Sequence, residues 1–160
     1  MSDILVVYYS LEGNTELAAN DLHEITGADL EKLIPENEPD GKSFTKYLAG
    51  GFTALTHYKP RIKALKHRPD DYSTIVIAAP VWASPCPPAV ETFLHKEPFS
   101  GKKVELVATS QSGKADAMIS RISGLAGSDN TVELTCSLVS PLKDPDRTRQ
   151  KLEEFCLAWA

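Results

Sequence analysis

The sequence predicts an α/β fold, namely an open, doubly wound parallel sheet of five strands with helices on both faces. Strand-like runs rich in β-branched residues alternate with helical patterns along the whole chain, and this alternation is typical of parallel sheets. The runs at residues 4–9 and 74–79 are continuously apolar, which indicates strands that are buried on both faces. Polar loops follow several of these runs, and such sheets bind ligands at these loops.

Each element is expected where a periodic pattern begins and a breaking residue ends it. Gly27 and Gly127 are placed to end helices, and Pro35 is placed to end a strand. Asp144 or Asp146 is expected to cap the last helix. The strands are expected at residues 4–9, 28–34, 74–79, 103–108 and 131–139, and the helices after Thr15, from 43, from 87 or 88, at 115–125 and from about 145 onward.

Length and composition indicate one ordinary globular domain, residues 1–160, with 42% hydrophobic and 24% charged residues. No apolar run approaches the ~20 residues of a membrane span, and the first strand follows Met1 too closely for a signal peptide. The three cysteines are isolated, so neither a disulfide framework nor a zinc site is expected. We therefore expect a cytoplasmic protein, and its net charge of −5 argues against nucleic-acid binding.

The loop after the first strand, Ser10-Leu11-Glu12-Gly13-Asn14-Thr15, predicts a phosphate site. It leads into a helix, and the first N–H groups of a helix lack internal partners while its dipole favours anions. The loop has no Lys or Arg and no nucleoside-triphosphate or dinucleotide fingerprint, so a single phosphate monoester held by N–H and hydroxyl groups fits it. The alternative is an ordinary turn in which Asn14 or Thr15 caps the helix.

Two further loops are expected at the same edge of the sheet. Residues 80–88 carry Trp82 among four prolines, and residues 109–113 (Thr-Ser-Gln-Ser-Gly) are small and polar. A phosphate site, a flat aromatic surface and a hydrogen-bonding edge together describe flavin mononucleotide (FMN) as the ligand. The alternative for Trp82 is a core residue that covers the end of the sheet.

With these loops the chain resembles the flavodoxin family over essentially its whole length. The resemblance rests on Ser10-x-x-Gly13-Asn14-Thr15, Ala79-Pro80-Val81-Trp82-Ala83 and residues 109–113. The segment Lys46-Tyr47-x-x-Gly50-Gly51 is similar to one in some flavodoxin-like proteins. The resemblance implies the strand order 2-1-3-4-5, and the unbroken last strand is similar to that of the short-chain branch.

The resemblance also implies which residues hold FMN. The expected cofactor-binding residues are Ser10, Leu11, Glu12, Gly13, Asn14 and Thr15 for the phosphate, Pro80, Val81, Trp82, Ala83 and Ser84 for the flavin ring, and Ser110, Gln111, Ser112 and Gly113 for its pyrimidine edge. Cys86 is expected to be structural, because no electropositive setting that would activate a thiol is visible. No histidine lies in the three loops, so no catalytic acid or base is expected, nor is a metal site.

Three functions remain open at this point. The first is a small FMN-dependent oxidoreductase that exchanges electrons with a nicotinamide or quinone-type molecule. The second is a flavodoxin proper, a one-electron carrier between redox proteins, and the third is a flavodoxin fold that has lost its flavin. Gln111 and Ser112 stand where many flavodoxins have an aromatic residue, which leaves the flavin more open and favours the oxidoreductase, whereas the acidic chain suits a carrier.

Ala83 separates one-electron from two-electron chemistry. By the resemblance it stands where flavodoxins commonly have a glycine, whose peptide turns over on reduction so that its carbonyl accepts a hydrogen bond from the new N5–H of the flavin. The turned peptide needs a positive φ, which costs alanine roughly 1–2 kcal/mol. We therefore expect photoreduction to bleach the flavin almost directly to its two-electron form, and Ala83→Gly to increase the long-wavelength absorbance of singly reduced flavin. Abundant singly reduced flavin in the unmodified protein would contradict this expectation.

Overall fold

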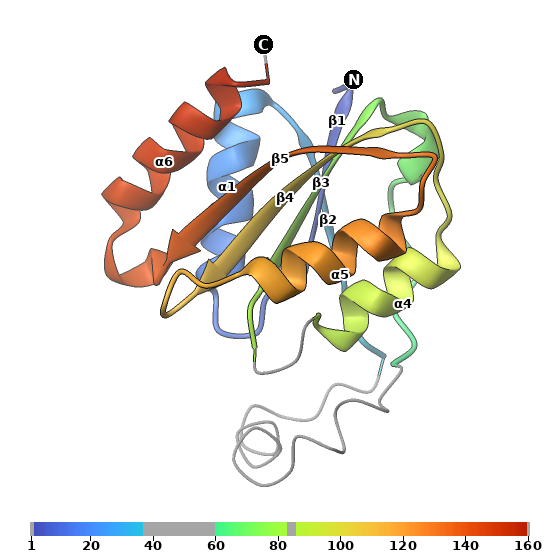
Figure 1. Cartoon of the computed structure of the whole chain (residues 1–160), viewed down its shortest axis with the longest axis horizontal. Helices are drawn as coiled ribbons and strands as arrows, with labels where there is room; N and C mark the ends of the chain where they lie inside the picture. The colour runs from blue at the N-terminus through green and yellow to red at the C-terminus, as the bar shows by residue number, and fades with distance from the viewer. Residues whose placement is uncertain (1, 37–59, 83–85, 160) are drawn as a thin grey trace, which may run out of the picture.

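A computed structural model describes residues 2–36, 60–82 and 86–159, and within them a five-stranded parallel sheet (Figure 1). The strand order is β2-β1-β3-β4-β5, which confirms the predicted topology. The strands are β1 (Ile4–Tyr8), β2 (Asp29–Lys32), β3 (Thr74–Pro80), β4 (Lys103–Ser110) and β5 (Thr131–Val139), and the helices are α1 (Asn14–Thr26), α4 (Pro88–Lys96), α5 (Asp116–Ala126) and α6 (Pro145–Leu157). Two short 3₁₀ turns, η1 (Pro69–Asp71) and η2 (Pro141–Lys143), complete the described elements.

Helices cover both faces of the sheet (Figure 1). α1 and α6 lie on one face, where Leu22 and Leu152 are fully buried against β-strand residues such as Val76. α4 and α5 lie on the other face, where Phe93 and Ile122 are fully buried. Among the described residues, no helix has the length and apolar character that crossing a membrane requires.

Most predicted boundaries agree with the structure to within two residues, and the departures have physical causes. β2 ends at Lys32, two residues before the predicted end: Leu33 still donates its N–H to the Tyr8 carbonyl, and Pro35 then forms an antiparallel bridge with Ile62. β4 continues two residues beyond the predicted Ala108, because Thr109 and Ser110 still pair with β5. The helix expected from residue 43, with its Gly50-Gly51 pair, lies outside the described residues.

A buried carboxylate sits where β4 and β5 lose their regular pairing. The register shifts between Val104 and Leu106, and the Glu105 side chain between them is fully buried. Its Oε2 accepts a hydrogen bond from the Leu134 backbone N–H at 2.7 Å, while the Lys103 Nζ lies 3.5 Å from Oε1. Burial raises the pKa of Glu105 above its ordinary value, although Leu134 and Lys103 partly oppose the shift.

We expect Glu105 to make the fold less stable as the pH rises above 4.5, the ordinary pKa of its side chain. In that range the folded chain binds a proton that the unfolded chain has released, so the stabilisation from the protonated group is lost as the pH rises through the folded pKa. Glu105→Gln keeps an oxygen that can accept from Leu134 but cannot ionise. In urea unfolding, its free energy of unfolding should therefore fall less than that of the unmodified protein between this pH and neutrality. If the free energy of unfolding fell equally with pH in the two proteins, the expectation would be contradicted.

Candidate functional site

The three predicted loops meet in one hollow at the carboxyl ends of β1, β3 and β4, which we call the loop pocket. Its volume is about 450 Å³. The residues that line it are Ser10, Leu11, Glu12, Asn14, Thr15, Pro80, Val81, Trp82, Thr109, Ser110, Gln111, Ser112 and Ser140. Of the other predicted site residues, Gly13 and Gly113 lie in the turns of the same loops but do not line the pocket, and Ala83 and Ser84 lie outside the described residues.

The loops after β1 and β4 are closed by the same Ser-x-x-Gly turn. Ser10 Oγ accepts a hydrogen bond from the Gly13 N–H at 3.2 Å, and Ser110 Oγ accepts one from the Gly113 N–H at 2.8 Å. Both glycines have a positive φ, +97° and +79°, which side chains disfavour. Each serine can still donate its hydroxyl hydrogen, so the two turns hold their shape while leaving a donor at the pocket. Because the Gly13 N–H is bonded within its loop, a bound anion would have to use other N–H groups.

The first turn of α1 has no side-chain cap. Its N-cap residue is Gly13, which has no side chain that could accept from the first N–H groups. The alternative in which Asn14 or Thr15 is an ordinary cap is therefore wrong, since both residues lie inside the helix. The uncapped N–H groups and the positive end of the helix dipole face the loop pocket, which is an arrangement that favours an anion.

Asn14 and Thr15 tie α1 to two other parts of the pocket wall. Asn14 Oδ1 accepts a hydrogen bond from the Leu142 N–H of η2 at 3.0 Å, so its amide NH₂ remains the group with hydrogens to donate. Thr15 Oγ1 lies 2.7 Å from Thr109 Oγ1 at the end of β4, and both residues are almost fully buried. This hydroxyl pair fixes the start of α1 against the loop that follows β4.

Trp82 combines the two alternatives that the sequence left open for it. Its ring packs edge-on against Tyr9, with centroids 5.5 Å apart and planes at 83°, so it is joined to the core. It also lines the loop pocket. The preceding residue, Val81, donates its N–H to the Thr109 carbonyl at 2.7 Å, which holds the Trp82 loop to the end of β4.

Two contributors to the pocket were not identified from the sequence. Ser140 lines it from beyond β5, has an unusual φ of +42°, and donates its N–H to the Ser110 carbonyl at 2.8 Å. Its position after a strand end was the available signal, because every parallel strand of the sheet ends at this edge. Thr109 was expected in a loop but is part of β4, and its buried contact with Thr15 has no sequence signature.

Charge and reactive groups are sparse around the pocket. Glu12 is the one charged residue among those described that line it. Burial raises the pKa of the Cys86 thiol to about 12, so a thiolate is disfavoured near neutral pH. This agrees with a structural role for Cys86. Within the described ranges, no cluster of metal-ligating side chains occurs.

The fold and the pocket define a class of protein, a doubly wound α/β protein with a ligand site at the strand ends of its sheet. A family model described as Flavodoxin matches residues 3–123. The chain belongs to the flavodoxin family.

Solved structures agree with this assignment at the level of the fold. The chain is similar to a candidate flavoprotein from Bacteroides eggerthii (TM-score 0.76, 23% identity, 98% of this chain and 99% of that one). It is also similar to one from Bacteroides uniformis (TM-score 0.75, 19% identity, 97% of this chain and 97% of that one). A third similar structure is a Lactobacillus acidophilus flavoprotein in complex with FMN (TM-score 0.63, 22% identity, 89% of this chain and 96% of that one). Among curated proteins, none matches the chain.

The buried pair of Thr15 and Thr109 should be measurable as a coupling in stability. Replacing either residue by valine leaves the other hydroxyl buried without its partner, which costs about 1–3 kcal/mol. The double substitution removes both hydroxyls, so its loss should be smaller than the sum of the two single losses. Urea unfolding of Thr15→Val, Thr109→Val and the double variant measures this difference. Additive losses would show that the two hydroxyls do not depend on one another.

Proposed function

We propose that the protein binds FMN in the loop pocket and acts as a small FMN-dependent oxidoreductase whose electron partner is a nicotinamide or quinone-type molecule. One observation carries the proposal: three loops distant in sequence converge on one hollow that has an uncapped helix N-terminus and the side chain of Trp82 in its walls. FMN would supply the redox chemistry, and the protein would supply binding, orientation and electrostatics. The FMN complex of the Lactobacillus acidophilus flavoprotein, a protein with a similar fold, supports this choice of cofactor.

The residues of the loop pocket fit the chemistry of FMN. At the phosphate end, the first N–H groups of α1, the Ser10 hydroxyl and the Asn14 amide would hold a phosphate monoester without a counter-charge. Trp82 would give the flavin ring an aromatic surface, and residues 110–113 would bond its polar edge. The pocket offers one such phosphate site and no basic side chain among its described lining, so FAD, with a second phosphate and an adenosine, should bind less well.

The open second loop favours an enzyme that acts on a small molecule. Gln111 and Ser112 are exposed at the rim of the loop pocket, and neither offers an aromatic ring that could cover a flavin. A small donor or acceptor would therefore have access to the cofactor. The net charge of −5 favours the second candidate, a one-electron carrier that docks on basic redox proteins. The amount of singly reduced flavin that accumulates on photoreduction separates the two.

The phosphate end of the proposal can be tested with FMN and riboflavin, which differ only in the phosphate. We expect the purified protein to be yellow or to become so with added FMN. Asn14→Ala removes a donor to the charged phosphate, so it should lower the affinity for FMN by about tenfold or more, as measured by a fluorescence titration. Riboflavin should be nearly unaffected by the same substitution.

Asn20→Ala is the matched control, because Asn20 is an exposed residue farther along the same helix. It should leave the affinity for both ligands unchanged. Equal weakening of FMN and riboflavin by Asn14→Ala would show that the substitution disturbs the loop through its contact with Leu142. A protein that takes up no FMN at all would overturn the proposed function.

A further inference from the structure

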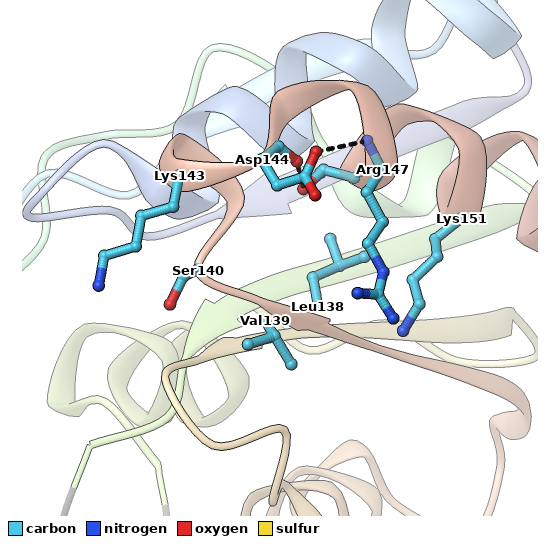
Figure 2. A pocket seen from close by; sticks show the side chains of 8 residues that line it. Leu138, Val139, Ser140, Lys143, Asp144, Arg147 and Lys151 are labelled. Carbon is cyan, nitrogen blue, oxygen red and sulfur yellow. Dashed lines mark hydrogen bonds between the residues drawn. The ribbon is translucent and has the colours of Figure 1, made fainter.

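A second hollow lies beside the loop pocket, between the end of β5 and the first turns of α6 (Figure 2). We call it the α6 pocket. Its volume is about 330 Å³, and its only lining residue shared with the loop pocket is Ser140. Leu138 and Val139 of β5 form an apolar floor, and Lys143, Arg147 and Lys151 bring positive charge to its walls. The flavin proposal uses none of these basic residues.

Two of the basic side chains, which lie four residues apart on α6, have no carboxylate partner among the described residues. In the view of Figure 2 the Arg147 and Lys151 side chains both extend from α6 toward the end of β5. Neither forms an ion pair within the described residues, and Lys151 reaches only the Ser137 carbonyl, at 3.5 Å. Like charges four residues apart on a helix destabilise it, so an anion bound between them would relieve this repulsion.

Two neighbouring side chains at the same helix do have partners. Arg149, on the same helix, is paired with Asp21, Glu24 and Glu153. Asp144 lines the α6 pocket, but its carboxylate accepts a hydrogen bond from the Arg147 backbone N–H at 3.1 Å and caps α6. In Figure 2 this bond lies on the side of Arg147 away from its guanidinium.

Charge and size together indicate the class of ligand. Three basic residues and one acidic residue line the pocket, a balance of 3 − 1 = +2, within a chain of net charge −5. A phosphate group carries up to two negative charges, and a guanidinium binds its oxygens in pairs. The volume falls in the range of small-molecule sites, about 300–1,000 Å³. Val139, half exposed at the floor, offers apolar surface to an organic group.

We propose that the α6 pocket binds the phosphate group of a small molecule, held between Arg147 and Lys151. This site is independent of the flavin proposal. It also differs from the loop pocket in kind, because its binding energy comes from side-chain charges and should weaken steeply with added salt.

The test uses the protein as purified, after removal of excess flavin, and three probes: inorganic phosphate, AMP and adenosine. Binding is followed by isothermal titration calorimetry at low and moderate salt. We expect saturable binding of phosphate and AMP, and none of adenosine. Tighter binding of AMP than of phosphate would identify an organic phosphate as the ligand type, and equal binding would identify the phosphate group alone.

The double variant Arg147→Gln/Lys151→Gln should bind both phosphate and AMP about tenfold or more weakly than the unmodified protein does. The matched control, Lys63→Gln with Lys96→Gln, makes the same change in net charge at exposed positions outside both pockets and should bind like the unmodified protein. The proposal is overturned if the unmodified protein binds neither phosphate nor AMP, or if the two double variants behave alike. Uptake of FMN, read by absorbance on the same samples, tests the flavin proposal separately.

Discussion

The contact between the hydroxyls of Thr15 and Thr109 joins two segments that are 94 residues apart in the sequence. Thr15 lies in the first turn of α1 and Thr109 near the end of β4, with β3 between β1 and β4 in the sheet. Because both residues are almost fully buried, neither can exchange this partner for water without moving the helix or the strand. The contact therefore sets how far the uncapped end of α1 stands from the loop after β4, which is the spacing that a ligand in the loop pocket must match.

The backbone around this contact is shaped before any ligand arrives. Each of the two Ser-x-x-Gly turns uses the N–H group of its glycine in an internal hydrogen bond, and Val81 and Ser140 donate their N–H groups to carbonyls at the end of β4. The loops that line the pocket after β3 and after β5 are therefore both hydrogen-bonded to the end of β4. Ordering those walls on binding would cost conformational entropy, and the existing hydrogen bonds reduce that cost.

The central part of this architecture could be predicted from the sequence, because buried parallel strands must be continuously apolar. β1 and β3 were placed correctly for that reason, and the loops that follow them, one polar and one carrying Trp82, marked the candidate site. Errors arose where the outcome depends on contacts distant in sequence. The early end of β2 depends on the pairing of Pro35 with Ile62, and the part played by Ser140 depends on Ser110, thirty positions earlier. Gly13 is a local case instead, because its N–H is bonded to Ser10 only three positions away, and this bond became visible only in the structure.

The two helices that begin beside the pockets show how one residue decides the kind of anion site that a helix end can become. Gly13 provides no side chain to cap α1, so the N–H groups of that helix remain for a ligand and no cation is needed nearby. Asp144 caps α6 and occupies the corresponding donor itself, and its negative charge opposes an anion at that end. Any anion held at α6 must therefore be bound by side chains farther along the helix, and these are Arg147 and Lys151. A site without basic side chains and a cationic site can thus lie on either side of Ser140, and they would respond differently to salt because only the second would hold its anion by exposed charges.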